Sequence, residues 1–84
     1  RSNQPFTSSD GKWVMVFNGE IYNYKSIKSE LTDYDFKTDS DTEVVLAAYI
    51  KWGDKCLRSF NGMFSFAIWD TYDKSLFLAR DRFG

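Results

Sequence analysis

Three polar groups stand side by side at Asn18, Gly19 and Glu20, directly after the apolar run 13–17. They are a side-chain amide, a glycine backbone N–H and a carboxylate, so hydrogen-bond donors and an acceptor meet at one point. An Asn-Gly pair is more commonly the turn of a β-hairpin. Here the residues after Gly19 indicate a helix, whereas a hairpin would need a returning strand. The pattern therefore predicts a strand that breaks into a turn at Asn18-Gly19 and then enters a helix.

The residue inventory excludes several kinds of catalysis. The chain contains no histidine, which removes Ser-His-Asp and Cys-His pairs and imidazole-based zinc sites from within it. Any acyl-transfer reaction would need another base, and no metal site is expected. Cys56 has no base nearby in the sequence and shares a helical face with Phe60. We interpret Cys56 as a packed thiol rather than a nucleophile.

Hydrophobic spacing predicts the elements that position these groups. Residues 13–18 are apolar at successive positions, which is typical of a short strand covered on both faces, with Trp13 and Phe17 in the core. Asn23 is a candidate N-cap for a helix that ends near Asp33. The buried face of that helix is expected to carry Tyr24, Ile27 and Leu31.

The clearest local signal is a capping box, in which Ser40 is followed three residues later by Glu43 ahead of an apolar run. It predicts a helix over 41–52 that Gly53 ends, followed by a short helical segment over 54–60. Between the two helices, 35–38 is expected to be weakly extended. The buried face of the second helix is expected to carry Val45, Ala48, Tyr49 and Trp52.

The last third of the chain predicts an antiparallel hairpin. Residues 63–69 and 75–80 are strands joined by a polar loop, and 63–69 alternates with large apolar groups on one face. Residues 1–11 are expected to be an entry loop. Strand, helix, helix and hairpin in that order indicate an α+β layered arrangement. Three strands would leave a sheet edge and apolar surface unpaired, so we expect 1–84 to be a single partial domain of a larger protein.

The composition excludes several classes of partner. The chain is 43% hydrophobic and 27% charged, without an apolar run near the ~20 residues that span a bilayer, so no membrane partner is expected. A net charge of -1 with scattered lysines and arginines offers no surface for nucleic acid. One cysteine and no secretory leader in view indicate a reducing cytoplasm. The isolated chain is expected to self-associate through its open sheet edge or exposed aromatic face.

Sequence motifs follow one another along nearly the whole chain. They are Gln4-Pro5, Asp10-Gly11, 17–23 (Phe-Asn-Gly-Glu-Ile-Tyr-Asn), 40–44 (Ser-Asp-Thr-Glu-Val), Trp52-Gly53, 61–70 and 76–84, which ends in Arg-Asp-Arg-Phe-Gly. In this order they resemble the N-terminal glutaminase domain of glutamine-hydrolysing asparagine synthetases, a group of class II glutamine amidotransferases. The Ile-Tyr-Asn continuation and the Arg-Asp-Arg-Phe-Gly end distinguish this resemblance from the hexosamine-phosphate and phosphoribosylamine enzymes.

The resemblance implies a fold and a reaction. The fold is a four-layer αββα sandwich of the N-terminal-nucleophile hydrolase type, of which this chain would be a part. An N-terminal cysteine thiolate attacks the glutamine amide with the free α-amino group as base, and the ammonia serves ATP-dependent amidation of aspartate. By resemblance, the Asn18 amide and the Gly19 N–H form the oxyanion hole, while Glu20 and Asp41 bind the substrate ammonium. The alternatives are a turn-exposed acid at Glu20 and a helix-dipole acid at Asp41.

The chain departs from the family's pattern at its start. Residue 1 is Arg and no cysteine lies near it, so the nucleophile is missing, as is the upstream segment that supplies an arginine for the glutamine carboxylate. We expect the chain alone to lack glutaminase activity. No cofactor is expected in it, because ATP and magnesium belong to a downstream synthetase domain and the chain has no Gly-rich phosphate loop. The expected partners are L-glutamine and the rest of the parent enzyme.

Two other functions are compatible with the same residues. One is a non-catalytic interaction or regulatory module with a degenerate glutaminase fold. The other is the amidotransferase domain of a relative that acts on another carboxylate, for example in surface polysaccharide synthesis. A Met-Cys start upstream in the parent reading frame would favour the enzyme over the module, and the downstream domain would identify the acceptor.

Overall fold

The computed structural model describes residues 5–81. In chain order the elements are β1 (Phe6–Thr7), β2 (Trp13–Ile21), α1 (Tyr24–Glu30), α2 (Asp41–Trp52), the 3₁₀ segment η1 (Gly53–Ser59), β3 (Gly62–Asp70) and β4 (Ser75–Arg80). The chain divides into two compact units, one made of Arg1–Gly19 with Met63–Gly84 and the other of Glu20–Gly62. Two α-helices with an antiparallel sheet confirm the predicted α+β class. No helix in the described part of the chain is long and apolar enough to cross a membrane.

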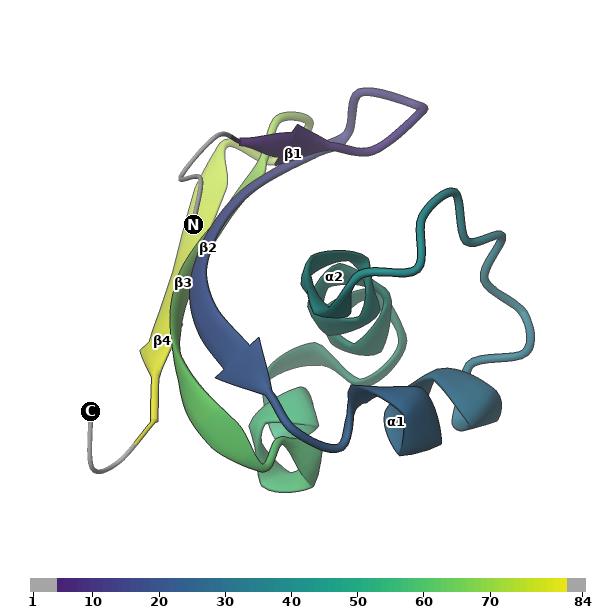
Figure 1. Ribbon diagram of the computed structural model, residues 1–84. Coiled ribbons are helices and arrows are strands. Elements are labelled where there is room, and N and C mark those ends of the chain that lie inside the picture. Colours follow the sequence, from purple (N-terminus) through teal and green to yellow (C-terminus); the bar gives the residue numbers. More distant parts are fainter. Residues whose placement is uncertain (1–4, 82–84) are drawn as a thin grey trace. The chain divides into compact units, whose positions relative to one another are not determined.

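The first unit carries the sheet, whose strands follow the order β1-β2-β3-β4 (Figure 1). β1 pairs antiparallel with β2, with Phe6 opposite Met15, and β4 pairs antiparallel with β3, with Ile68 opposite Phe77. The expected entry loop over 1–11 is therefore wrong at Phe6–Thr7, and the sheet has one strand more than predicted. A two-residue strand is too short for side-chain alternation to reveal it.

One face of the sheet is buried. Along β3 the buried positions alternate and include Phe64, Phe66 and Ile68, which confirms the alternation predicted for 63–69. The centroid of the Phe66 ring lies 5.9 Å from that of Phe64 and 6.4 Å from that of Phe17. Aromatic pairs at these separations stabilise a fold beyond the area they bury. The aromatic residues therefore hold β2 and β3 together on this face.

The opposite face of the sheet is exposed. Val16 is 40% exposed between the buried Met15 and Phe17, and Trp13 is only half-buried. Phe17 is confirmed as a core residue, but the expectations that Trp13 is core and that 13–18 is covered on both faces are wrong for this chain. The large apolar side chains exposed on the strands are Val16, Met63, Trp69, Leu76 and Leu78. An apolar face of this kind requires cover by another surface.

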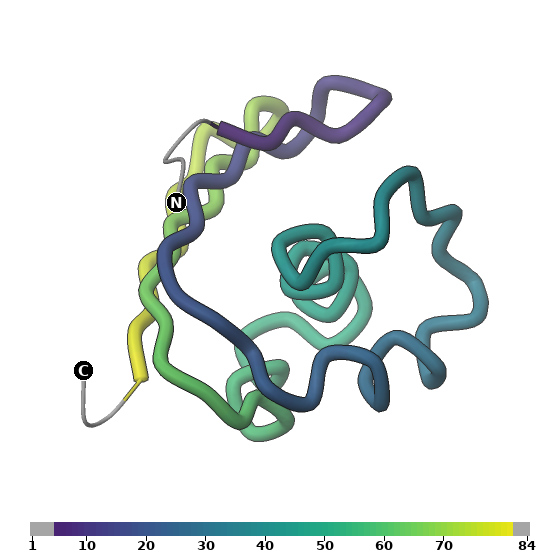
Figure 2. Tube along the Cα trace, viewed as in Figure 1, coloured from purple at the N-terminus to yellow at the C-terminus, as the bar shows by residue number. Residues whose placement is uncertain are grey.

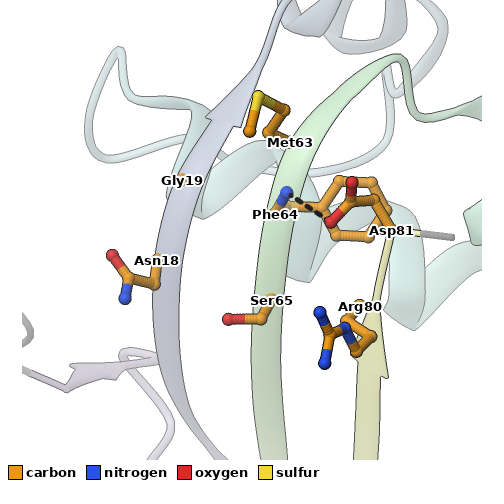
Figure 3. A pocket seen from close by; sticks show the side chains of 7 residues that line it. All are labelled: Asn18, Gly19, Met63, Phe64, Ser65, Arg80 and Asp81. Carbon is orange, nitrogen blue, oxygen red and sulfur yellow. Dashed lines mark hydrogen bonds between the residues drawn. The ribbon is translucent and has the colours of Figure 1, made fainter. Parts of the chain in front are cut away.

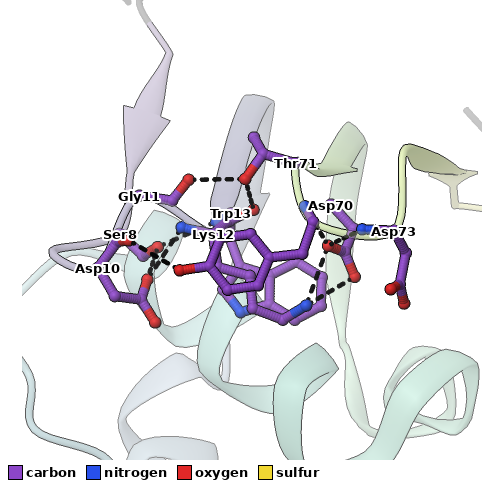
Figure 4. Close-up of polar contacts among 9 residues, drawn as sticks. Ser8, Asp10, Gly11, Lys12, Trp13, Asp70, Thr71 and Asp73 are labelled. Carbon is purple, nitrogen blue, oxygen red and sulfur yellow. Dashed lines mark hydrogen bonds and ion pairs between the residues drawn. The ribbon is translucent and has the colours of Figure 1, made fainter.

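A polar cluster joins the loop between β1 and β2 to the turn between β3 and β4 (Figure 4). Lys12 Nζ lies 2.9 Å from both carboxylate oxygens of Asp70. The same ammonium lies over the rings of Trp13 and Tyr72, at 4.5 and 4.9 Å from their centroids. Its hydrogen bond to Asp70 raises the pKa of Lys12, and the backbone N–H of Asp73, together with Lys12, lowers the pKa of Asp70. Lys12 therefore stays charged between two rings and a carboxylate.

The second unit contains α1, α2 and η1, with α2 packed against both α1 and η1. The predicted bounds 41–52 are confirmed, and Gly53 ends α2 with φ +64. Six consecutive residues of α2 are buried, from Glu43 to Ala48, so burial extends around the helix rather than along one stripe. Tyr49 and Trp52, expected on the buried face, are half-buried.

The first helix differs from its prediction at both ends. α1 ends at Glu30, before the expected Asp33. Asn23 occupies the N-cap position but makes no capping hydrogen bond with its side chain. Instead its Nδ2 donates to the Ser59 carbonyl and its Oδ1 accepts from the Asn61 N–H, at 2.8 and 3.0 Å. The side chain of Asn23 thus links the start of α1 to the segment that enters β3.

The loop over 31–40 connects α1 to α2 without regular secondary structure (Figure 2). The extended segment expected over 35–38 is not a strand. The reason is that the backbone N–H groups of Lys37 and Thr38 donate to the carboxylate of Glu43 rather than to a neighbouring strand. The loop is therefore folded around a side chain.

Candidate functional site

Asn18 and Gly19 lie within β2 and not in a turn, because the strand continues to Ile21. The predicted turn is therefore wrong, and the glycine explains why. Gly19 has φ +118, a conformation that lets the strand distort without ending and that other residues rarely adopt. A Cβ added there would overlap the carbonyl oxygen of Met63 and lie 2.8 Å from Phe64 Cα. Only glycine fits at this position.

A pocket of about 350 Å³ has Asn18 and Gly19 in its lining (Figure 3). The other lining residues are Met63, Phe64, Ser65, Arg80 and Asp81. Asn18 on β2, Ser65 on β3 and Arg80 on β4 contribute polar groups from three strands, and Ser65 and Arg80 are directly opposite each other in the β3–β4 pairing. The pocket thus contains an amide, a hydroxyl and a guanidinium, and at Gly19 no side chain covers the backbone.

Sequence reasoning did not assign Ser65 or Arg80 to the site. Both are exposed, and no ion pair joins Arg80 to another residue in the part of the chain that the structure describes. A sequence signal for both residues exists, because each is a polar residue in an otherwise apolar strand. The register of the hairpin places the two residues opposite each other. Arg80 adds a positive charge to a lining that also contains the carboxylate of Asp81.

Asp81 fixes the backbone beneath the pocket (Figure 3). Its N–H donates to the Phe64 carbonyl at 3.0 Å, and its Oδ1 accepts from the Phe64 N–H at 3.3 Å. These two bonds continue the pairing of β3 beyond the end of β4. Phe64 is the residue whose Cα lies against Gly19, so Asp81 helps to hold the surface on which Gly19 rests.

Glu20 and Asp41 lie in the second unit. Glu20 is exposed at the end of β2, and Asp41 is the half-buried first residue of α2. The N–H of Ile21 donates to Asp41 Oδ2 at 3.1 Å. The structure therefore ties the Asp41 carboxylate to the residue that follows Glu20, and it brings these two acids to the same part of the unit.

Comparison with known proteins identifies the family. The family model described as a glutamine amidotransferase domain matches residues 1–84. The chain belongs to the glutamine amidotransferase domain family. Glutamine-hydrolysing asparagine synthetase 2 of Bacillus subtilis is 49% identical over 81 residues, which cover 96% of this chain and 11% of that protein. A putative glutamine-hydrolysing asparagine synthetase of Mycobacterium tuberculosis is 50% identical over 76 residues, or 87% of this chain and 12% of that protein.

The chain spans only 11% to 14% of the length of the asparagine synthetases that it matches. A glutamine-hydrolysing asparagine synthetase of Zea mays is 42% identical over 96% of this chain, which corresponds to 14% of that protein. Among solved structures, the glutamine phosphoribosylpyrophosphate amidotransferase of Bacillus subtilis superposes with a TM-score of 0.70 and 23% identity, over 95% of this chain and 20% of that one. This likeness confirms the predicted fold class, a partial sandwich of the N-terminal-nucleophile type.

Cys56 of the amidotransferase domain is a core residue. It is fully buried in η1. Burial in the first place, and the nearby Asp54 in the second, raise the pKa of the thiol to about 12. A thiol in that state is not a thiolate at neutral pH. The interpretation of Cys56 as a packed thiol is confirmed.

The remaining residues of interest do not form a metal centre in the described part of the chain. Residues 5–81 contain no group of three or more histidine, cysteine, aspartate or glutamate side chains that could hold a metal ion. Gln4 and residues 82–84, which belong to the family motifs, lie outside the described residues, as does Arg1.

Proposed function

We propose that this chain is part of the glutaminase domain of a glutamine-dependent asparagine synthetase. In the whole protein the domain hydrolyses glutamine, and the ammonia is used for ATP-dependent amidation of aspartate in a synthetase domain that binds ATP and magnesium. The observation that carries the proposal is the placement of Asn18 beside Gly19 in a pocket where a glycine is sterically required. The family membership and the names of the similar proteins support the same reaction.

In this proposal Asn18 and Gly19 stabilise the oxyanion. Attack on the carboxamide carbon of glutamine places negative charge on the amide oxygen, and donors held rigidly at that position are each typically worth ~3–4 kcal/mol of barrier. The Asn18 side-chain amide and the Gly19 N–H are such donors. Their location on β2 supports the role, because a paired strand holds donors more rigidly than a surface turn.

We assign the substrate ammonium to Glu20 and Asp41. Asp41 Oδ2 accepts from the Ile21 N–H, which fixes the direction of the carboxylate and leaves Oδ1 for a substrate. A charge-assisted hydrogen bond from the glutamine ammonium to Oδ1 would add a second fixed contact. Glu20, exposed one residue before Ile21, supplies another carboxylate in the same part of the unit.

The attacking thiolate comes from outside these residues in our proposal. Cys56 is the one cysteine of the chain, and its burial and raised pKa make it unsuitable. The chain is then one partial domain that contributes the oxyanion donors and the acids, and it should not turn over glutamine alone. A cytoplasmic location is part of the proposal, since a free buried thiol is compatible with a reducing compartment.

The test uses the full-length protein that contains this domain, with glutamine labelled with ¹⁵N in its amide. With aspartate, ATP and magnesium present, we expect labelled asparagine and one glutamate for each asparagine formed. Ammonium in place of glutamine serves as the control, because it bypasses the glutaminase step. If the label appeared in the amide of another carboxylate, the protein would catalyse a related amidation instead of asparagine synthesis. If no glutamate were released, the domain would be a non-catalytic module and not a glutaminase.

A further inference from the structure

The loop over 31–40 is organised around one buried carboxylate, that of Glu43. This residue is completely buried on α2. Both of its oxygens accept from the Lys37 N–H, at 3.1 and 3.0 Å, and Oε1 also accepts from the N–H and the hydroxyl of Thr38, at 2.7 and 2.9 Å. A buried carboxylate needs such partners to offset its desolvation. Glu43 and this loop are therefore mutually dependent.

The Glu43 carboxylate binds residues that precede the N-cap, which a capping box does not involve. The predicted capping box is confirmed in one direction only, because Ser40 Oγ accepts from the Glu43 N–H at 3.4 Å. In a full box the Ser40 N–H would donate to Glu43, but here it donates to Thr38 Oγ1 at 3.3 Å. Thr38 is thus inserted between Glu43 and Ser40 as a relay.

This relay ends at Ser40, the residue directly before Asp41 of the proposed site. Asp41 directly follows Ser40 as the first residue of α2, and its carboxylate receives the Ile21 N–H. We propose that Glu43 is a positioning residue that sets the direction of the Asp41 carboxylate toward the ammonium of the substrate. The inference rests on the proposed function, since it gives Glu43 a role in glutamine binding through Asp41.

Neighbouring acids of the same loop do not share this arrangement. Asp39 forms an ion pair with Lys28 at 3.1 Å, and its side chain is 78% exposed. Asp35 forms an ion pair with Lys37 at 2.8 Å, and its side chain is 87% exposed. Exposed pairs contribute little to structure. Asp39→Asn is therefore a matched control, an acid-to-amide change in the same loop without the buried bonds.

Glu43→Gln keeps the shape of the side chain but replaces one acceptor oxygen by a donor. The remaining oxygen can keep the three donors that Oε1 binds, but the new NH₂ group would face the Lys37 N–H that Oε2 accepts now. Two donors then oppose each other, and a neutral amide accepts more weakly than a carboxylate, so the loop and the start of α2 must rearrange. The substrate ammonium is bound in the ground state and the transition state alike, and loss of such a contact raises KM while kcat is retained. We expect the KM for glutamine to rise about tenfold, equivalent to about 1.4 kcal/mol.

The experiment measures kcat and KM for glutamine in the full-length protein carrying Glu43→Gln, Asp39→Asn, Asp41→Asn and the Glu43/Asp41 double variant. Asp39→Asn should leave both constants unchanged. In the Asp41→Asn background, Glu43→Gln should change KM less than about twofold, because a residue that acts through Asp41 has nothing left to position. An equal tenfold rise in both backgrounds would mean a general structural role and would overturn the inference, as would an unchanged KM in the single variant.

Two further measurements distinguish a failure of this inference from misfolding of the variant and from a failure of the proposed function. Urea unfolding reports whether the domain carrying Glu43→Gln folds. If it does not, Thr38→Val, which removes only the hydroxyl relay, should raise KM in the same direction, and an unchanged KM would count against the relay. Hydrogen exchange at the Ile21 amide reports the position of Asp41 without any activity. It should be faster in Glu43→Gln and unchanged in Asp39→Asn, even if the wild-type protein failed to hydrolyse glutamine. Equal exchange in both variants would contradict the inference.

Discussion

Replacing Gly19 with alanine in the full-length protein should remove most glutamine hydrolysis while the domain remains folded. Gly19 has φ +118, and its Cα faces the backbone of β3. The added methyl group would overlap the Met63 carbonyl oxygen and lie 2.8 Å from Phe64 Cα, whereas ordinary contact begins at 3.4 Å. Strand β2 must therefore move by at least 0.6 Å relative to Phe64, and by more relative to Met63.

This displacement acts on the proposed oxyanion donor itself. A misplacement of ~1 Å in a catalytic geometry can cost ~10²-fold in rate, and removal of one oxyanion donor costs ~10²–10³-fold in kcat. We therefore expect kcat for glutamine hydrolysis to fall by about 10²-fold, equivalent to about 2.7 kcal/mol. The unfavourable backbone conformation adds about 1–3 kcal/mol of lost stability.

Gly11→Ala is the matched control for this prediction. Gly11 also has a positive φ, +76, but nothing lies within 4 Å of an added Cβ. This variant carries the backbone penalty, about 1–2 kcal/mol, without the clash. Its urea midpoint should fall while kcat stays within about twofold of wild type.

The assay is steady-state glutamate release, with urea unfolding to verify that the domain of each variant is folded and ammonium-driven synthesis to verify that the synthetase step is unaffected. A folded Gly19→Ala protein with kcat within about threefold of wild type would show that the Gly19 N–H does not stabilise the oxyanion, because an oxyanion donor acts only when its position is fixed. Equal losses of activity in Gly19→Ala and Gly11→Ala would contradict that role as well, since only the first variant disturbs the pocket.

Three further predictions concern the ion pair, the thiol and the exposed sheet face. Asp70→Asn should lower the urea midpoint near neutral pH. Because the pKa of Asp70 is held below 3.8, the stability that its carboxylate contributes is complete above that pH and is lost as the pH falls through the folded-state pKa. A difference in urea midpoint between the variant and the wild type that persists in acid would contradict this prediction. The raised pKa of Lys12 acts at the other end, with its contribution complete below pH 10.5 and lost as the pH rises through the folded-state value. Cys56, with a pKa of about 12, should resist alkylation in the native protein and react only on unfolding; complete labelling under native conditions would count against its burial. The isolated 84-residue chain should sediment as an oligomer and bind a hydrophobic dye through its exposed sheet face, and Leu78→Lys should weaken both; a monomer that binds no dye would contradict this expectation.

The elements with strong local signals could be predicted from the sequence. The bounds of α2 follow from Ser40 at its start and Gly53 after its end, since a cap and a glycine act within one helical turn. The alternation of Phe64, Phe66 and Ile68 likewise indicates the buried face of β3. Cys56 is likewise predictable as a packed residue, because nothing near it in the sequence could activate its thiol.

The remaining features depend on contacts between residues distant in the sequence. The turn propensity of Asn18-Gly19 is overridden because Gly19 packs against the backbone of Met63 and Phe64, and no local pattern contains that contact. Arg80 enters the pocket through the pairing of β4 with β3. Asn23 and Glu43 hydrogen-bond beyond their helix ends, to segments whose conformation the spacing of apolar residues does not determine.

The central claim is that Asn18 stabilises the oxyanion formed during glutamine hydrolysis, and Asn18→Ala in the full-length protein tests it most directly. We expect kcat for glutamine to fall by about 10²–10³-fold with KM changed less than about threefold, because the lost donor acts mainly in the transition state. Ammonium-driven synthesis should be retained. A folded Asn18→Ala protein that hydrolyses glutamine with kcat within about threefold of wild type would mean that Asn18 does not stabilise the oxyanion.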